Sequence, residues 1–312
     1  MTVEAGHHAL VQVATATLWT SPTAPVDDDR LALGSHSAVR DWVAGMTREQ
    51  RVDGLVDRTV SQVLLGDEVL VETVEDGWAK VVATQQTSTL DERGYPGWVP
   101  VGQLTTAVRT AEGGDHVVSA TATSIRDEPD GEVLIPGVTL GTRLPVLDEE
   151  PYRGWSRVVL PGPQQPGWVR CRDISPAPGG QVSPASGRVD LMSIAAQLLD
   201  IPYVWGGLSA YGLDCSGLVH LAFRQLGIAV PRDAHDQAAA ATRIPDEDAQ
   251  PGDLYFFARP GKRIHHVGIV AAPQDNEPRM IHAAGNYGKV VEEAITAERR
   301  DTFAGTYRVF AE

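Results

Sequence analysis

The sequence predicts a multidomain protein in which two copies of one small all-β unit precede an α+β domain. Three observations lead to this prediction. An internal repeat of short strand-like runs, separated by turns that contain Gly and Pro, covers the first part of the chain. The stretch 176–187 is rich in Pro, Gly and Ser and has the composition of a linker. Beyond it, helical apolar spacing comes first and strand-like runs follow, an order typical of α+β domains with an antiparallel sheet.

Composition and charge set broad limits. The chain has 312 residues, enough for two or three domains, and 42% of them are hydrophobic, enough for packed cores. The net charge of -15 argues against a nucleic-acid partner or an anionic membrane held by bulk electrostatics. No apolar stretch approaches the length of a membrane span. Residues 1–8 lack a basic-then-apolar pattern, so we expect a cytoplasmic protein, or a secreted one if a signal was trimmed.

The chain has two cysteines, Cys171 and Cys215. A disulfide between them would leave Cys215 without a reactive thiol. Because we expect this thiol to be a nucleophile, we expect both cysteines to be free. Cys171 follows a Trp-Val run and is expected to be structural. No cysteine pair has the spacing of a zinc site, and we expect neither a metal nor a cofactor.

The repeat defines the two β units. Four segments of the first have counterparts in the second: 11–18 with 117–125, 65–71 with 140–146, 77–81 with 154–158, and 96–100 with 166–170. We place the units at 8–110 and 111–180. The first is longer because of an insertion, roughly 26–60, whose position in the unit stays open and in which 37–43 is expected to be helical. Both units resemble bacterial SH3-like barrels, in which a Pro-Gly-Trp-Val strand near the end is typical.

The α+β domain is expected at 188–312. Its first helix shows helical apolar spacing, with Asp190 or a neighbour as the N-cap. Apolar residues from Leu218 to Leu226, followed by Gly227, predict a second helix that ends at this glycine. A third helix is expected around 236–242. Strands are expected at 254–257, 264–271, 280–283 and 306–310.

Cys215 lies at the start of the second helix. Asp214 is a favourable N-cap, so the thiol falls in the first turn, where unpaired backbone N–H groups and the helix dipole favour a thiolate and a lowered pKa. A lone cysteine in apolar surroundings is more often a small buried hydrophobe. The histidines downstream favour the catalytic interpretation, because a nucleophilic thiol needs a base and the base needs an orienting group.

Those histidines lie on two strand-like runs. His265 and His266 are adjacent and would face opposite sides of a strand, so only one can face the thiol. Cys215, His266 and His282 thus supply a nucleophile, a base and an orienting group in chain order. The alternative for His282 is a core histidine whose hydrogen bonds are satisfied.

Residues 190–312 resemble the NlpC-type papain-like cysteine peptidases of bacterial cell-wall metabolism. Each motif is weak alone, but the set follows the family's order: Pro-Tyr-Val-Trp-Gly-Gly at 202–207, Asp-Cys-Ser-Gly at 214–217, Pro-Arg-Asp at 231–233, Pro-Gly-Asp-Leu-Tyr-Phe-Phe at 251–257, His-Val-Gly-Ile at 266–269 and Met-Ile-His-Ala at 280–283. With two SH3-like units in front, the chain resembles the γ-D-glutamyl-L-diamino-acid endopeptidases, also called dipeptidyl-peptidase VI. The resemblance implies hydrolysis of the γ-D-Glu–diamino acid bond in murein stem peptides that carry a free N-terminal L-Ala.

The same resemblance implies catalytic roles. Cys215 attacks the carbonyl carbon of the γ-D-Glu linkage. His266 activates the thiol and later protonates the leaving amine, and His282 orients His266.

It also implies a substrate-binding set. Asp233 receives the free ammonium, although it could also cap the helix that follows it. Tyr95 of the first β unit helps to close that end of the cleft, and the Tyr203 hydroxyl stabilises the oxyanion or shapes the site. Ser216 and Trp205 complete the set. A site with a buried carboxylate would reject an acylated amine, because the carboxylate would be left unpaired.

Two departures from the family pattern concern the amine site. Ala234 stands where Ser commonly follows the Pro-Arg-Asp motif, so one substrate hydrogen bond is expected to be missing. The subfamily also uses an acidic residue of the first SH3-like unit there, and its position stays open. Asp67 and Glu68 are available, but we expect a surface-charge role for either.

Other functions stay open at this point. An extracellular hydrolase whose SH3-like units bind intact wall would need an export signal. A cell-wall binding protein with an inactive peptidase domain disagrees with the joint presence of Cys215, His266 and His282. An amidase or acyltransferase on the same frame would keep the nucleophile and the base without the Asp233 and Tyr95 features. The preferred diamino acid and the oligomeric state also stay open.

Overall fold

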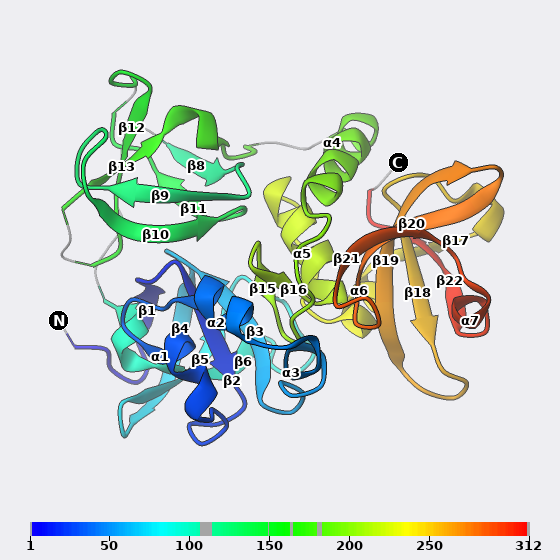
Figure 1. Cartoon of the computed structure of the whole chain (residues 1–312), viewed down its shortest axis with the longest axis horizontal. Helices are drawn as coiled ribbons and strands as arrows, with labels where there is room; N and C mark the ends of the chain where they lie inside the picture. The colour runs from blue at the N-terminus through cyan, green and yellow to red at the C-terminus, as the bar shows by residue number, and fades with distance from the viewer. Residues whose placement is uncertain (1, 107–113, 149, 163–164, 180–182, 311–312) are drawn as a thin grey trace.

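The structure is a computed structural model that describes residues 2–106, 114–148, 150–162, 165–179 and 183–310 (Figure 1). Three bodies follow one another along the chain, coloured blue to cyan, green, and light green to red. The predicted boundary between residues 110 and 111, and the predicted end of the second unit at residue 180, lie outside the described residues.

The first body is one antiparallel sheet with the strand order β3-β2-β6-β5-β4-β1-β7. Strand β6 alternates between buried and more exposed residues along its whole length, whereas β2 is buried throughout. The buried side chains form one apolar cluster inside the sheet. The strands are β1 His8–Val11, β2 Thr15–Trp19, β3 Thr59–Leu64, β4 Glu68–Glu75, β5 Trp78–Ala83, β6 Tyr95–Pro100 and β7 Leu104–Thr105, with the 3-10 helix η2 Val101–Gln103 before β7.

The second body repeats this topology. Its described strands are β8 Asp115–Val118, β9 Ala122–Arg126, β10 Val133–Thr139, β11 Arg143–Pro145, β12 Trp155–Val158, β13 Gly167–Arg170 and β14 Ile174–Pro176, with η3 Cys171–Asp173 before β14. They form the sheets β10-β9-β13-β12 and β11-β8-β14, which match β3-β2-β6-β5 and β4-β1-β7 strand for strand. The internal repeat is therefore confirmed, and both units are SH3-like.

The insertion of the first body lies between β2 and β3. Trp42 packs on Trp19 with their ring centroids 6.0 Å apart, and its Nε1 donates a hydrogen bond to Asp29. The apolar core of the insertion also includes Val204 of the third body. The insertion thus packs both on strand β2 of its own body and on the third body. Its elements are η1 Asp27–Asp29, α1 Arg30–Leu33, α2 Val39–Gly45, which covers most of the predicted helical segment, and α3 Arg48–Val52.

The third body has an antiparallel sheet in the order β17-β22-β18-β19-β20-β21, which confirms the predicted α+β class. The predicted strands are present, but the last ends at Arg308 rather than at residue 310. The edge strands β17 and β21 were not predicted. The strands are β17 Thr242–Ile244, β18 Leu254–Ala258, β19 Ile264–Gln274, β20 Glu277–Ala284, β21 Lys289–Ala294 and β22 Phe303–Arg308, and a short hairpin joins β15 Leu208–Ser209 to β16 Gly212–Leu213.

The first helix of this body begins earlier than predicted. Ser183, not Asp190, is its N-cap, and the Ser183 hydroxyl accepts a hydrogen bond from the backbone N–H of Ser186. Pro184 occupies the first helical position, where a missing N–H costs nothing. The helices are α4 Pro184–Gln197, α5 Cys215–Gln225, α6 Ala234–Ala240 and α7 Ala297–Arg300, with η4 Asp246–Asp248. None of the described helices combines the length and the apolar character that crossing a bilayer requires.

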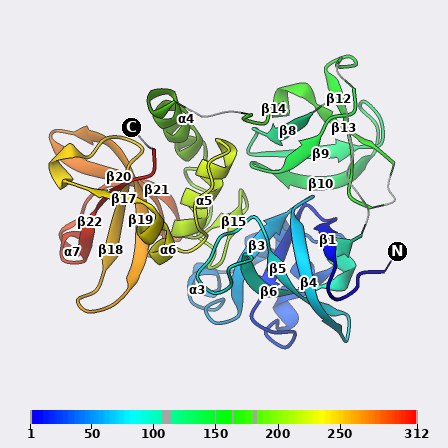
Figure 2. The same cartoon turned by 180° about the vertical axis from the view of Figure 1, so that it is seen from behind.

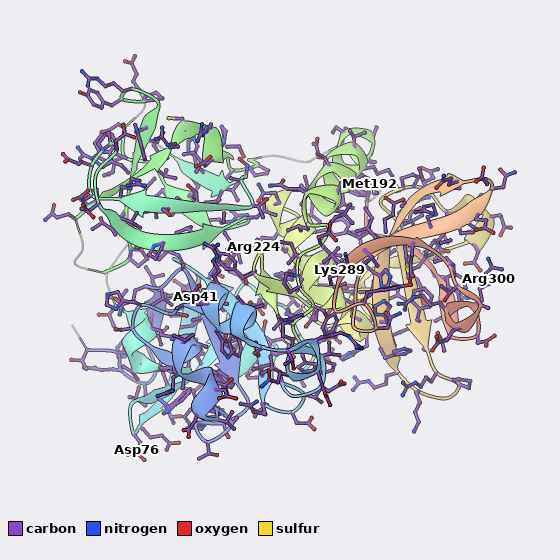
Figure 3. All side chains as sticks on the ribbon, viewed as in Figure 1. Asp41, Asp76, Met192, Arg224, Lys289 and Arg300 are labelled. Atoms are coloured by element: carbon purple, nitrogen blue, oxygen red, sulfur yellow. The ribbon has the colours of Figure 1, made fainter. Side chains whose placement is uncertain are left out.

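The three bodies lie next to one another (Figure 2) and meet at Arg224 of α5, which is labelled in Figure 3. Its Nη2 pairs with Asp67 of the first body, and both side chains are buried. Its Nε donates a hydrogen bond of 3.0 Å to the carbonyl oxygen of Gly141 in the second body. Leu64 and Leu140, from the two β units, belong to the main apolar cluster of the third body. Each β unit therefore contributes a buried leucine to the apolar cluster of the third body.

Candidate active site

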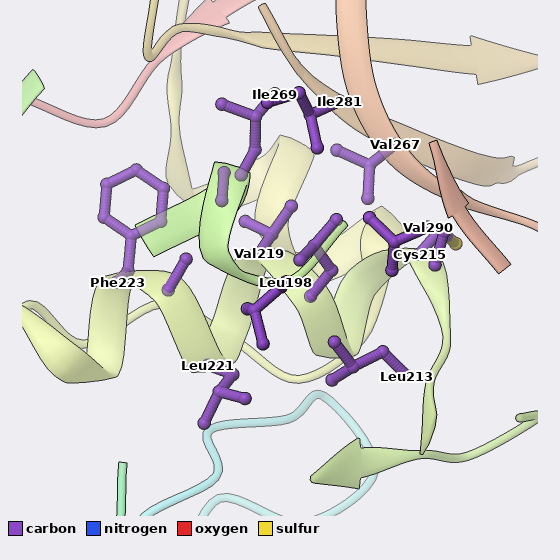
Figure 4. Close-up of a cluster of buried hydrophobic side chains, with 14 of the residues drawn as sticks. Leu198, Leu213, Cys215, Val219, Leu221, Phe223, Val267, Ile269, Ile281 and Val290 are labelled. Carbon is purple, nitrogen blue, oxygen red and sulfur yellow. The ribbon is translucent and has the colours of Figure 1, made fainter. Parts of the chain in front are cut away.

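Cys215 is the first residue of α5, as predicted. The side chain of Asp214 accepts a hydrogen bond of 2.6 Å from the backbone N–H of Gly217 and so caps the helix. The thiol lies at the edge of the apolar cluster between α5 and the sheet, beside Val267 and Val290 (Figure 4). Cys215 is only 8% exposed, and both cysteines of the chain are free.

The expected lowering of the Cys215 pKa is wrong for this structure. Burial, with a further contribution from the Asp214 carboxylate, raises the pKa of the thiol to about 12. The backbone N–H groups of Val267 and Ser216 oppose this rise only in part. The start of a helix favours a thiolate, but desolvation outweighs it here. The resting sulfur is therefore a neutral thiol that must lose its proton during the reaction.

His266 and His282 face each other from β19 and β20. His266 Nε2 lies 2.8 Å from His282 Nδ1, and their rings meet edge to face. His266 is buried and its neighbour His265 is exposed, as expected for adjacent residues of a strand. Gly268 allows β20 to pack closely against β19 beside this pair, because a Cβ there would lie 2.5 Å from Met280 Sδ and 3.2 Å from the Cβ of His282. Burial lowers the pKa of His282 and places that of His266 well below 6.5, so both rings are neutral.

Asp214 is structural, as expected, and forms a buried network that the sequence did not reveal. Arg232, which is 1% exposed, donates hydrogen bonds to both carboxylate oxygens of Asp214 at 2.7 and 3.0 Å. Its other donors reach Ser216 Oγ at 3.0 Å and Ser61 Oγ of the first body at 2.9 Å. The Ser216 hydroxyl is thus occupied within this network. Arg232 links the start of the nucleophile helix to the first SH3-like domain.

Tyr203 and Trp205 lie on the segment that approaches α5. Tyr203 is buried, and burial together with the nearby Cys215 raises the pKa of its phenol. Trp205 is 40% exposed, and its backbone makes two hydrogen bonds to the first body. Its N–H donates to the carbonyl oxygen of Arg51 in the insertion, and its carbonyl accepts from Thr59 Oγ1. The first domain therefore holds the backbone at Trp205 through these two hydrogen bonds.

Asp233 and Tyr95 meet across the boundary between the third and first bodies. The Tyr95 hydroxyl lies 3.1 Å from Asp233 Oδ2. Asp233 stands at the N-cap position of α6, yet its side chain makes no capping hydrogen bond. Burial raises the pKa of this carboxyl, while the Arg232 charge acts to lower it. The carboxylate is thus free of a structural capping role and faces an interdomain boundary.

The two acids of the first body that the sequence offered for the amine site lie elsewhere. Asp67 is 4% exposed and pairs with Arg224, so the expected surface-charge role is wrong for this residue. It also accepts the backbone N–H of Leu64. Glu68 is exposed and pairs with His8. Neither contacts Asp233 in the described structure.

One group of described residues has the spacing of metal ligands. Asp233, His235 and Asp236 each offer an atom within 4.8 Å of the others. Asp236, however, accepts hydrogen bonds from Thr89 N–H and Oγ1 at 3.0 and 2.9 Å, and Asp233 accepts from Tyr95. Because both carboxylate oxygens of Asp236 already bind protein hydrogens, we assign no metal to the group.

Known proteins share this organisation. The model of the NlpC/P60 family matches residues 200–304. Over 286 residues, the chain is 35% identical to a gamma-D-glutamyl-L-lysine dipeptidyl-peptidase of Bacillus subtilis (strain 168). The matched region covers 89% of this chain and 90% of that protein. A protein of the same name from Bacillus cereus (strain ATCC 10987 / NRS 248) is 31% identical over 281 residues, with coverages of 88% and 82%.

A solved structure agrees over the whole length. The crystal structure of an NlpC/P60 family protein from Bacillus cereus ATCC 10987 matches with a TM-score of 0.85 at 29% identity and covers 98% of this chain and 100% of that one. The chain therefore belongs to the NlpC/P60 family and is a cysteine peptidase of peptidoglycan.

Proposed function

We propose that this peptidase removes L-Ala-D-Glu from murein stem peptides whose N-terminal L-Ala is free, by hydrolysing the bond between γ-D-Glu and the diamino acid. The paired Asp233 and Tyr95 carry the proposal. A half-buried carboxylate that is not used as a helix cap suits a substrate ammonium, whose burial is unfavourable without such a partner. The names of the two Bacillus relatives support the same bond.

The proposed reaction uses Cys215, His266 and His282. His266 takes the thiol proton through Nδ1 while Sγ attacks the γ-carbonyl carbon, so that an S–C bond and an oxyanion form. The backbone N–H of Cys215 and the Tyr203 hydroxyl stabilise the oxyanion. The C–N bond then breaks and His266 gives its proton to the leaving amine. Water, activated by the same base, hydrolyses the thioester, releases L-Ala-D-Glu and restores the thiol.

The free amine is expected to decide whether a peptide is cut. L-Ala-γ-D-Glu-L-Lys and its diaminopimelate counterpart should release L-Ala-D-Glu, and N-acetylation should reduce kcat/KM by at least about a hundredfold, because Asp233 would stay unpaired. Mass spectrometry of the products measures both rates. Equal cutting of free and acetylated peptides would contradict the proposal and favour a hydrolase of intact wall.

A variant of Asp233 tests the same contact from the protein side. Asp233→Asn should raise KM for the free peptide and reduce the preference for it over the acetylated one, because the amide carries no charge. Asp275→Asn, in an exposed turn, is the matched control and should keep both constants. An unchanged preference in the Asp233 variant would show that the ammonium binds elsewhere.

The pH profile follows from the low pKa of His266. The base must be neutral to accept the thiol proton, so activity is lost as the pH falls through the pKa of His266. Burial, and after it the neighbouring His282, Arg299 and His265, keep that pKa well below 6.5. We expect kcat to be retained at pH 6.5 and to fall only well below it, as rates measured across the acid range would show. An acid limb of kcat at or above pH 6.5 would contradict this assignment.

A further inference from the structure

Three side chains form a line across β19, β20 and β21, which are neighbours in the sheet (Figure 1). His282 of β20 lies opposite Val291 of β21, and Glu293 lies two residues further along β21 on the same face. This diagonal position is within reach of a long side chain. Glu293 Oε1 lies 3.0 Å from His282 Nε2, while His282 Nδ1 lies 2.8 Å from His266 Nε2.

Glu293 is itself held in place. Arg299 of α7 donates from Nε to the same carboxylate oxygen at 2.8 Å. Hydrogen bonds from His282, Arg299 and Tyr287 lower the pKa of Glu293 to about 2, so the side chain is a carboxylate at neutral pH. A carboxylate can only accept hydrogen bonds. The Glu293 end of the line is therefore a fixed acceptor.

The positions of the protons follow from this acceptor. His282 must carry its proton on Nε2 to donate to Glu293, and because the ring is neutral its Nδ1 is an acceptor. His266 must then carry its proton on Nε2 to donate to His282 Nδ1. The neutral His266 ring is left with an unprotonated Nδ1, which is the atom that the proposed reaction requires.

We propose that Glu293 is a positioning residue that sets the tautomers of His282 and His266 and so keeps His266 Nδ1 ready to accept the thiol proton. The proposal rests on the function proposed above. Without an acceptor at this place, His282 can move its proton to Nδ1. That proton would meet the Nε2–H of His266 and favour the His266 tautomer that cannot act as a base at Nδ1.

Three variants test the proposal through kinetics. Glu293→Ala removes the acceptor and should lower kcat about ten- to hundredfold with little change in KM. Glu293→Gln keeps an oxygen that can accept the same hydrogen bond and should retain most of kcat. Glu292→Gln, the neighbour that pairs with Arg279 on the surface, is the matched control and should match the wild type. Thermal unfolding of each variant shows whether it is folded.

Nitrogen NMR of the histidine rings gives a readout that does not depend on turnover. In the wild type both rings should be protonated on Nε2, and in Glu293→Ala the His282 signals should move toward the Nδ1-protonated form. Wild-type kcat in Glu293→Ala, or unchanged ring signals, would overturn the proposal. If the wild type cuts no stem peptide, the proposed function fails, but the NMR comparison still decides the role of Glu293.

Discussion

Cys215→Ala is expected to abolish cleavage of stem peptides, with a loss of at least about 10⁴-fold in kcat. No other group can form the thioester, and an isolated base leaves only slow attack by water. The fold should persist, because the change removes one sulfur at the edge of the apolar cluster. Release of L-Ala-D-Glu measured by mass spectrometry, together with thermal unfolding, separates lost chemistry from lost structure.

Cys171→Ala is the matched control. Cys171 lies in the second SH3-like domain, where its sulfur contacts Ser156 Oγ at 3.1 Å. The Cys171→Ala variant should keep the kcat and KM of the wild type. Residual turnover of the Cys215 variant near the wild-type level would exclude the thiol mechanism. Loss of activity in the Cys171 variant would show that the second domain influences the site.

Arg232→Met is expected to reduce the free energy of unfolding by about 3–5 kcal/mol, because it leaves the buried Asp214 carboxylate without its partner. The capped start of α5 should loosen with it, so kcat should also fall. Denaturant unfolding measures the stability. Arg172→Met, at a largely exposed arginine, is the control and should change stability by less than about 0.5 kcal/mol.

A double variant separates the lost charge pair from lost packing. Asp214→Asn combined with Arg232→Met removes both buried charges and should recover part of the stability that Arg232→Met loses alone. If Arg232→Met is as stable as the wild type, the pair contributes nothing net. If the double variant is no more stable than the single one, the arginine acts mainly by filling space between the domains.

Sequence patterns predicted the structural features that residues close together in the chain determine. The cap at Asp214 and the helix that follows are encoded within a dozen positions, and the repeated Leu-Gly turns at residues 65–66 and 140–141 revealed two copies of one fold. The start of α4 was missed for a local reason as well. Its first turn is rich in Pro, Ser and Gly and has the composition of a linker, although Ser183 and Pro184 form a good helix start.

The parts of the site that were missed depend on contacts between distant segments. Asp67 pairs with Arg224, which lies 157 positions away, and a single sequence gives no sign of that pairing. Glu293 belongs to a charged edge strand that was not predicted, and its link to His282 follows only from the strand register. The burial that raises the pKa of Cys215 comes from the packed domain, whereas the helix start seen in the sequence favours the opposite shift.

The buried contacts between the three bodies have a consequence for how this chain can be divided or recombined. SH3-like domains are often treated as portable parts, but here Leu64 and Leu140 complete the apolar cluster of the peptidase domain, and Val204 completes that of the insertion. A peptidase domain cut out at the linker would expose these apolar contacts and the Arg224 charge to solvent. A chimera with SH3-like domains from another protein would keep the catalytic groups but would lack the SH3-like surfaces that pack against the peptidase domain and shield it from solvent. For this chain, engineering of the peptidase domain therefore has to include its contacts with both SH3-like domains.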